Sequence, residues 1–226
     1  MLIAQSLKIQ RGESIILNRC SFSLKEGSFT YLAGASGVGK STLLWTLARM
    51  YPLIAGELWF QGKSQNEIMV NRWRTNIALL PQSPIILPGT VADNLLYPLQ
   101  TFRIQKERYE FLPKTEKLHK ELDTVGLGDI PLEREAASLS GGQQSRIALI
   151  RLILTQPKII LADEPTTGVD QATSKLVLNR LHRFCEEGGA VLITSHVHAE
   201  LMQCTHIILN GNAGLSIKTC LSTSVG

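Results

Sequence analysis

One short stretch decides the fold of this sequence: Gly34-Ala35-Ser36-Gly37-Val38-Gly39-Lys40-Ser41-Thr42. A strand-like run at 28–33 precedes it, and a helix-like run at 43–49 follows it. A strand, a glycine-rich turn and a helix in this order form a phosphate-binding loop, in which backbone N–H groups surround phosphate oxygens. Glycines leave room for the phosphate, and the helix N-terminus adds positive partial charge. The stretch therefore predicts a nucleotide phosphate site.

Two side chains of this stretch are expected to contact the nucleotide or its metal ion. Lys40 is expected to reach the β- and γ-phosphates as a point charge, and the Ser41 hydroxyl is expected to ligate Mg²⁺. An ordinary glycine-rich turn is the plain alternative. Such a turn needs neither a strand before it nor a helix after it, so the flanking runs favour the phosphate site.

The composition is that of a globular protein. The chain has 226 residues, of which 44% are hydrophobic and 19% are charged, and its formal net charge is +4. This length fits one large domain, or one domain with subdomains, around a sizeable core. Basic residues are interspersed with acidic ones, so nucleic acid is not expected as a main partner. The mild positive balance suits a phosphate ligand or a face near a membrane, and solvated surface charge explains it equally well.

Cysteines and apolar runs bear on where the chain works. No Cys-x-x-Cys pair occurs, and the widely spaced cysteines are most simply reduced thiols of a cytosolic protein: Cys20, Cys185, Cys204 and Cys220. Lys8 comes too early for the apolar core of a signal peptide. No apolar run approaches the roughly 18 residues of a membrane span. If the protein works at a membrane, we expect another chain to supply the span.

Short apolar runs alternate with helix-like segments through the second half of the chain. Strands suited to a buried parallel sheet are expected at 76–80, 158–162, 190–194 and 206–209, with a helix at 171–187. Residues 1–33 read as β-structure, and residues 91–152 are helical and charged. Strands that alternate with helices predict an α/β fold with a mostly parallel sheet covered by helices.

Two carboxylates end one of these apolar runs. Asp163 and Glu164 follow four apolar residues directly. Ligands of an open α/β sheet bind at the carboxyl ends of its strands, so this pair can face the phosphate loop. We expect Asp163 to hold Mg²⁺, directly or through water, and Glu164 to polarise the attacking water as a general base. A solvated acidic pair is the alternative, but charges that end a buried strand would then be an uncompensated cost.

A second stretch of small residues, Leu139-Ser140-Gly141-Gly142-Gln143, precedes a helix-like run at 144–155. A serine hydroxyl, two unhindered backbone N–H groups and a helix N-terminus make an anion site by the same physics as the first loop. One nucleotide does not need two such sites from one chain. We therefore expect a head-to-tail dimer, in which Ser140 of one chain covers the phosphate loop of the other. An ordinary capped helix start is the alternative.

Together these motifs resemble the ATP-binding cassette (ABC) ATPase family, over nearly the whole chain. Six motifs of that family occur here in the family's order. They are Walker A at 34–42, the Q-loop at Gln82, the signature at 139–143, Walker B at 159–164, the D-loop at 167–170 and the switch at His196. The signature matches without a substitution. The D-loop, Thr167-Gly168-Val169-Asp170, varies the usual pattern of small residues.

The resemblance implies a fold and a domain organisation. It implies a P-loop NTPase core of the RecA-like type with a mostly parallel sheet, an N-terminal antiparallel β subdomain and an inserted α-helical subdomain. Residues 1–226 would form a single ABC ATPase domain. The nucleotide-binding core with the β subdomain would occupy about 1–90 and 155–226, and the helical signature subdomain about 91–154.

The resemblance also implies roles for individual residues. ATP and Mg²⁺ would be the cofactors, and the nucleotide would be bound by 34–42 together with Ser140, Gly141, Gly142 and Gln143. The metal ligands would be Ser41, Gln82 and Asp163. The catalytic residues would be Lys40, Gln82, Glu164 and His196. Among these, Gln82 would link the site to a membrane partner, and His196 would contact the γ-phosphate. Asp170 would help to set the opposite site across the dimer.

Two positions depart from the family's pattern. The family usually stacks adenine on an aromatic residue about twenty residues before Walker A, and Arg11 stands at the matching position. A guanidinium plane can stack on a base, so Arg11 is kept as a nucleotide-binding candidate. Weaker base selectivity is the resulting hypothesis, and strong preference for ATP over GTP would count against it. Val197 stands where the family often has Asp, and no mechanism attaches to it.

A single cassette without a span resembles the separate nucleotide-binding subunit of a transporter. The implied partners are a polytopic membrane permease, contacted near 82–97, and a second cassette, either in a homodimer or as a paired cassette. The implied location is the cytoplasmic face of the membrane. The segment 87–95 resembles the segment after the Q-loop of exporters, but 132–138 lacks the Gly-rich motif that fused exporters carry before the signature. This combination, with 147–151 after the signature, looks most like the stand-alone ATP-binding subunits of the iron-export (Fet-type) group, and the substrate does not follow from this likeness.

Two other classes of protein remain as alternatives. A soluble ABC ATPase that acts on ribosomes or DNA would be a non-transport enzyme, but tandem cassettes, long coiled-coil insertions and zinc insertions are not present in this sequence. A catalytically dead regulatory cassette would be a binding module. The intact Lys40, Asp163, Glu164 and His196 argue against that second alternative.

Overall fold

The computed structural model describes residues 1–102, 112–194, 204–209 and 215–220, which form two β-sheets with helices around them. The first sheet has the order β2-β1-β4-β5, with β1 (Leu2–Arg11), β2 (Ser14–Leu24), β4 (Ala55–Phe60) and β5 (Lys63–Ser64). The second sheet has the order β10-β9-β3-β8-β7-β6, with β3 (Phe29–Ala33), β6 (Ile77–Leu80), β7 (Ile159–Asp163), β8 (Ala190–Thr194), β9 (Cys204–Leu209) and β10 (Leu215–Cys220). The helices are α1 (Lys40–Leu47), α2 (Val70–Asn76), α3 (Val91–Thr101), α5 (Thr115–Asp123), α6 (Gly141–Leu154) and α7 (Gln171–Glu186), with a short 3₁₀ turn at Ala136–Ser138.

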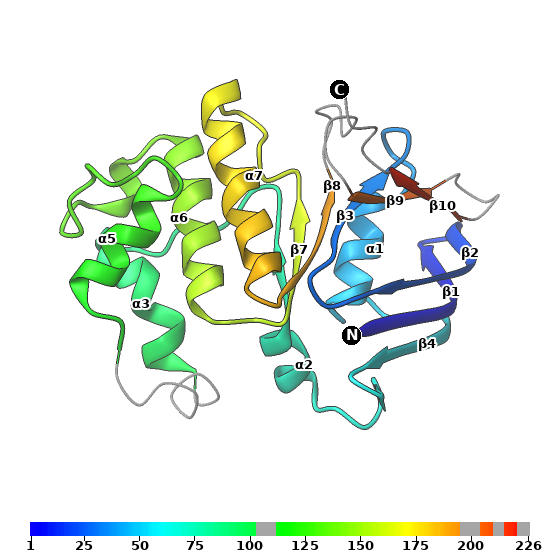
Figure 1. Cartoon of the computed structure of the whole chain (residues 1–226). Helices are drawn as coiled ribbons and strands as arrows, with labels where there is room; N and C mark the ends of the chain where they lie inside the picture. The colour runs from blue at the N-terminus through cyan, green and yellow to red at the C-terminus, as the bar shows by residue number, and fades with distance from the viewer. Residues whose placement is uncertain (103–111, 195–203, 210–214, 221–226) are drawn as a thin grey trace.

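The second sheet confirms the predicted α/β fold with a P-loop core. Strands β9, β3, β8, β7 and β6 pair in parallel, whereas β10 at the edge pairs antiparallel with β9. Helices α3, α5 and α6 lie on the far side of α7 from the sheet, and α1 lies between the two sheets (Figure 1). The subdomain boundaries near residues 91 and 154 stay a prediction.

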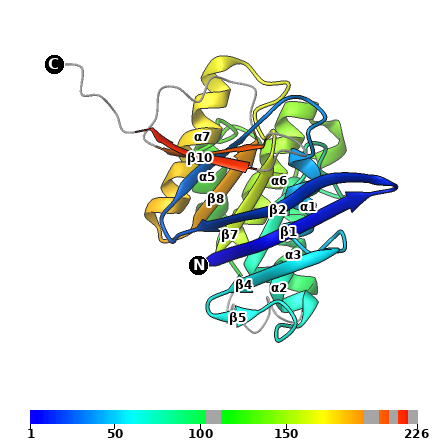
Figure 2. The same ribbon diagram turned by 90° about the vertical axis from the view of Figure 1, so that its right-hand side faces the viewer.

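The first sheet is antiparallel and covers α1 on the side away from α7 (Figure 2). Its central strand β1 pairs with β2 and with β4 through irregular registers. Ser6 and Arg19 adopt left-handed backbone conformations, with φ of 47° and 54°. The Ser6 N–H donates to Ser21 Oγ at 2.8 Å instead of joining the ladder. Such bulges bend a ribbon, and here they let the long strands curve over α1.

Apolar residues of the parallel strands alternate between two cores. Tyr31, Ile160 and Ile193 belong to the core shared with α6 and α7, whereas Leu161 and Leu192 belong to the core shared with α1 and the first sheet. Successive strand residues point to opposite faces, so a strand covered on both sides must be apolar throughout. All five residues of β7 and of β8 are buried, as this arrangement requires.

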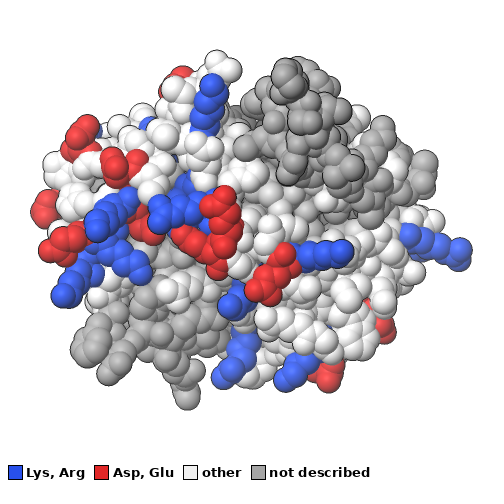
Figure 3. All heavy atoms as spheres, in the orientation of Figure 1, with Lys and Arg blue, Asp and Glu red and all other residues white. Residues whose placement is uncertain are grey.

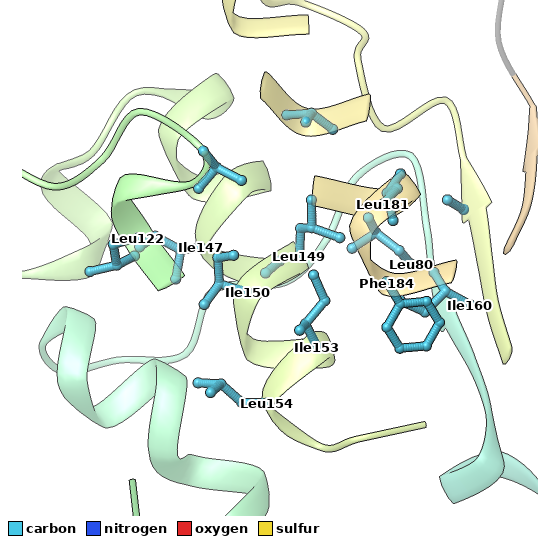
Figure 4. Packing of buried hydrophobic residues seen from close by; sticks show 14 of the residues in the cluster. Leu80, Leu122, Ile147, Leu149, Ile150, Ile153, Leu154, Ile160, Leu181 and Phe184 are labelled. Atoms are coloured by element: carbon cyan, nitrogen blue, oxygen red, sulfur yellow. The ribbon is translucent and has the colours of Figure 1, made fainter. Parts of the chain in front are cut away.

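Helix α6 stands at the centre of the first of these cores. Its side chains Ile147 and Ile150 face Leu122 of α5, while Leu149 and Ile153 face Leu181 and Phe184 of α7 (Figure 4). A fully buried leucine or isoleucine contributes about 1.5–3 kcal/mol relative to an exposed one. The helix that begins at the predicted anion site is therefore held on both sides by apolar packing.

The outer surface agrees with the charged character expected of residues 91–152. Basic and acidic side chains lie close together over the region of α5 and α7 (Figure 3). Within the ranges that the structure describes, no helix combines the length and the apolarity needed to cross a membrane.

His182 of α7 lies against the first residue of β3. Its ring stacks on the Phe29 ring with centroids 3.8 Å apart and an interplanar angle of 8°. Its Nε2 atom is buried and has no hydrogen-bond partner among the described residues. Burial lowers the pKa of His182 from its ordinary value of 6.5, and Glu186 raises it by a smaller amount. The folded state therefore favours the neutral ring.

We expect this histidine to make stability depend on pH. The folded state binds the proton less readily than the unfolded state, so the stability from His182 is complete above about pH 6.5 and is lost as the pH falls below that value. His182→Phe, which keeps the stacking, should lose less of its free energy of unfolding between pH 7 and pH 5 in urea titrations. His119→Gln on α5 serves as the control, and identical pH dependence in His182→Phe and the wild type would contradict the assignment.

Candidate nucleotide site

The backbone of the phosphate loop has the conformation that its glycines allow. Gly34, Gly37 and Gly39 have φ of 146°, 77° and 105°, which other residues adopt only with strain. A Cβ at Gly39 would overlap the side chain of Ile16 in β2, and a Cβ at Gly34 would lie 2.8 Å from the carbonyl oxygen of Leu209. The glycines thus serve close packing against β2 and β9 as well as access for a phosphate.

Helix α1 begins at Lys40, within the stretch 34–42 and three residues before the helix-like run predicted at 43–49. Its N-cap residue Gly39 makes no side-chain capping bond to the first turn. The Lys40 ammonium donates to the carbonyl oxygens of Gly34 and Ala35 at 2.9 and 3.0 Å. The lysine charge therefore lies within the loop, next to N–H groups of a helix start that can accept an anion.

The predicted acidic pair lies at the end of β7, next to β8. Asp163 is 5% exposed, and its Oδ1 accepts a hydrogen bond of 2.7 Å from the hydroxyl of Thr194. The same hydroxyl accepts from the backbone N–H of Glu164 at 2.9 Å. Glu164 has φ of 50°, an uncommon conformation for a residue with a side chain. Thr194 thus holds both acidic residues, and we did not predict its role; the only signal for it is a polar residue that ends a buried apolar run.

Gln82 and Glu164 come together although they are 82 residues apart in the sequence. The amide Nε2 of Gln82 donates to Glu164 Oε2 at 3.0 Å, and the Thr167 hydroxyl donates to the same oxygen at 3.0 Å. The structure thus places the predicted Q-loop residue against the predicted general base. Thr167 belongs to the predicted D-loop, but its bond to Glu164 was not predicted.

The second anion candidate forms the start of α6. The Ser140 hydroxyl accepts from the backbone N–H of Gln143 at 3.3 Å, and the Gln143 side chain accepts from the Ser140 N–H at 3.0 Å. This reciprocal pair is a capping box. The ordinary capped helix start, given above as the alternative, is therefore present. Gly141 and Gly142 follow the cap in the first turn, and their backbone remains accessible. The cap and an anion site are therefore compatible.

A cavity of about 650 Å³ lies beside this helix start. It is lined by the start of α6, by residues 82–84, by Arg146 and by 167–170 with Thr173. Asp170 caps α7 by accepting from the Thr173 N–H at 2.9 Å, and Arg146 donates to the carbonyl oxygen of Gly142 at 3.1 Å. Burial lowers the pKa of Arg146, and the nearby Asp170 partly offsets this shift. The segments predicted as the signature, Q-loop and D-loop thus line one cavity.

Two predicted site residues, Arg11 and His196, stay predictions. Arg11 is exposed at the end of β1, opposite Ser14 of β2. The contact between Gly39 and Ile16 brings the neighbouring part of β2 against the phosphate loop, but the role of Arg11 in base binding stays a prediction. His196 and Val197 lie outside the described residues.

Comparison with known proteins agrees with this arrangement of motifs. A model of the ABC transporter family matches residues 17–167. The chain is 33% identical over 216 residues to the probable iron export ATP-binding protein FetA of Escherichia coli, covering 95% of this chain and 93% of that protein. It is 34% identical over 181 residues to the phosphonates import ATP-binding protein PhnC of Trichormus variabilis, covering 79% and 74%. The dimeric ATP-binding cassette MJ0796, solved in a post-hydrolysis state with ADP and Pi, matches with a TM-score of 0.79 at 25% identity, covering 98% of this chain and 100% of that chain.

The fold and the site define a P-loop ATPase. More particularly, the chain belongs to the ABC transporter family and is an ABC ATPase, which binds and hydrolyses ATP. The likeness to iron-export ATP-binding subunits that its motifs predicted is matched by FetA. Its relatives carry out both export and import according to their names, so the direction of transport does not follow from the family.

The Thr194 hydroxyl generates the first test of the site. Thr194→Val keeps the volume of the side chain and removes the donor to Asp163 and the acceptor for Glu164. A hydrogen bond to a charged group contributes about 1.5–3 kcal/mol, so we expect kcat for ATP to fall by roughly tenfold or more. Thr30→Val, buried in the adjacent strand β3, controls for general loss of stability. Steady-state ATPase assays that show equal kcat in the two variants would remove Thr194 from the site.

Proposed function

We propose that two copies of this chain close head to tail on two Mg·ATP, and that hydrolysis reopens the pair to power transport through a separate membrane permease. The observation that carries this proposal is the separation of two anion sites in one chain. The cavity beside Ser140 is lined by several motifs, but none of its lining residues comes from 34–42. A phosphate in the loop of one chain can therefore be covered by a Ser140 site only if a second chain supplies it. The dimeric relative with ADP and Pi supports this arrangement.

The proposed site binds ATP through the backbone of 34–42 and the charge of Lys40. Mg²⁺ prefers oxygen ligands, and the hydroxyl of Ser41, the carboxylate of Asp163 and the amide oxygen of Gln82 are the proposed set. The ion would neutralise charge on the phosphates when it is bound. The hydrogen bond from Thr194 supports this assignment, because it fixes one oxygen of a buried Asp163 carboxylate at the strand end.

Glu164 is the proposed general base for the attacking water. Its Oε2 is held by Gln82 and Thr167, and its backbone N–H by Thr194. A carboxylate fixed at the edge of the sheet can orient water in line with the γ-phosphate. Positioning and charge stabilisation do most of the work in phosphoryl transfer, so small displacements of this group matter. His196 is proposed to contact the γ-phosphate on the strength of its motif alone.

Glu164→Gln tests both the base and the dimer. Glutamine keeps an acceptor oxygen for Gln82 and Thr167 but cannot take a proton. General base catalysis contributes typically 10²–10⁴-fold, so we expect kcat to fall by about that factor while ATP still binds. Size-exclusion chromatography with light scattering should show a dimer that accumulates with Mg·ATP and dissociates without it. Glu116→Gln on the exposed part of α5 should behave as the wild type, and free turnover in Glu164→Gln would exclude this role.

An apolar groove next to the Q-loop is the proposed contact for the permease. It has a volume of about 660 Å³ and lies between α2 and β6 on one side and α3 and α6 on the other. Three of its residues are large, apolar and exposed: Ile85 by 75%, Phe102 by 55% and Met50 by 42%. Exposed apolar surface of this kind marks an interaction site. We propose that its occupant is an apolar helical segment from a cytoplasmic loop of a polytopic membrane protein, as relatives named for iron export and phosphonate import suggest.

Ile85→Asp tests the groove directly, because it places a charge where the segment would dock. Tagged Glu164→Gln chain with Mg·ATP should retain a polytopic membrane protein from solubilised native membranes, and the additional Ile85→Asp change should abolish that retention. Leu176→Asp, on the exposed side of α7, is the matched control and should have no effect. Retention by all three chains would place the contact elsewhere.

The same experiment separates the alternative function. A soluble ABC ATPase outside transport would retain ribosomes or nucleic acid rather than a membrane protein. The identity of a retained membrane protein would also decide whether the iron-export type, suggested by the likeness to FetA, applies to this chain.

A further inference from the structure

Arg151 joins two segments that the proposed mechanism needs to keep in place. It lies in the last turn of α6, and its Nη2 donates to the carbonyl oxygen of Ile85 at 2.7 Å. Its Nη1 donates to Oδ1 of Asn94 at 3.2 Å. Burial lowers the pKa of Arg151, as is usual for a charge withdrawn from water. One planar guanidinium thus spans from α6 to the Q-loop segment and to α3.

Asn94 completes the connection from within α3. It is fully buried, and its Nδ2 donates to the carbonyl oxygens of Leu87 and Thr90 at 2.9 and 3.1 Å. Its Oδ1 accepts from the Leu87 N–H at 2.9 Å in addition to the bond from Arg151. Both donors and both acceptor positions of the amide are therefore in use. The segment 85–87 is pinned by side chains on two different helices.

This pinned segment leads directly to the candidate site. Ile85 follows Gln82 by three residues, and Gln82 donates to Glu164. The other end of α6 is capped by Ser140, which precedes the first helical residue Gly141 and lies about 16 Å from Arg151 along the helix at roughly 1.5 Å per residue. The position of Arg151 therefore ties the Q-loop to the same helix that presents the signature. Because α6 is packed on both sides, a shift of the Q-loop segment is mechanically linked to a shift of the signature residues at the start of α6.

The same residues also line the apolar groove. Arg151, Leu152 and Ile85 all line it, and Arg151 donates to the backbone of Ile85, which is the most exposed of the groove's three exposed large apolar residues. Anything that seats on Ile85 therefore contacts the segment that Arg151 fixes.

We propose that Arg151 is a positioning residue, which fixes 85–87 against α6 and so holds Gln82 at Glu164. The proposal rests on the roles assigned above to Gln82 and Glu164. The planar guanidinium of Arg151 bonds to two separate acceptors, the carbonyl oxygen of Ile85 and Oδ1 of Asn94. A lysine has a single nitrogen and cannot reproduce this geometry. The effect passes through Gln82, so Arg151 influences turnover without touching the nucleotide. A purely structural role for Arg151 would instead affect stability alone.

The test uses the isolated chain and two matched arginines. Arg49 is the control, because its Nη1 also pins a loop by donating to two carbonyl oxygens, those of Gln65 and Ile68, both at 2.8 Å. Arg151→Lys and Arg49→Lys are expected to lower the melting temperature by similar amounts. Only Arg151→Lys should lower kcat, by five- to tenfold, with KM for ATP unchanged within twofold. Hydrogen–deuterium exchange should become faster at 83–90 in Arg151→Lys and not in Arg49→Lys.

A double-mutant cycle with Gln82→Ala decides whether the effect passes through Gln82. If it does, Arg151→Lys should change kcat by less than twofold in the Gln82→Ala background. Independent, multiplicative losses of kcat would overturn the proposal, as would unchanged exchange at 83–90. If Gln82→Ala and Glu164→Gln both keep full kcat, the proposed catalytic roles fail together with this proposal. If those two variants lose activity and Arg151→Lys does not, only the proposal for Arg151 fails.

Discussion

The parallel pairing of β3, β8, β7 and β6 is the constraint on which the site depends. Parallel strands deliver their carboxyl ends to one edge of a sheet. Asp163 lies opposite Thr194 in the β7–β8 pair, and Leu32 lies opposite Thr194 in the β3–β8 pair. The phosphate loop after β3, the acidic pair after β7 and Gln82 after β6 therefore meet, although long helical segments separate them in the sequence. A slip of one residue would exchange the side chains that face the two cores and displace these groups relative to one another.

Burial at this edge withdraws the Asp163 carboxylate from water, and Thr194 supplies a hydrogen bond in its place. An ionised carboxylate withdrawn from water costs several kcal/mol unless it is hydrogen-bonded or paired. Asp163 is almost fully buried, and the hydroxyl of the fully buried Thr194 donates to it. The same threonine holds the N–H of Glu164 in a left-handed conformation. Backbone strain of this kind persists where the surroundings determine it and is concentrated at functional sites.

The features predicted from the sequence are those whose chemistry is local. The phosphate loop and the cap formed by Ser140 and Gln143 depend on residues within a few positions, so their spacing alone is informative. The bond from Thr194 to Asp163 joins residues 31 apart, and the bond from Arg151 to Asn94 joins residues 57 apart. No periodicity in one sequence encodes such pairs, because they exist only after the strands and helices have packed. Strand β10 was also missed, since it is a short edge strand whose antiparallel pairing with β9 forms only in the folded protein.

The site combines a closely packed part with a part held by one side-chain hydrogen bond. The phosphate loop lies so close to β2 and β9 that a Cβ at Gly39 or Gly34 would overlap or crowd them. Gln82, by contrast, reaches Glu164 through a side-chain hydrogen bond of 3.0 Å. A bond to a charged group contributes about 1.5–3 kcal/mol, which is the range of typical coupling free energies between two sites. An apolar segment seated on Ile85 could supply that much by burying about 100 Å² at roughly 25 cal/mol per Å². Under the proposed function, Gln82 rather than the phosphate loop would be the group through which a partner in the groove alters hydrolysis.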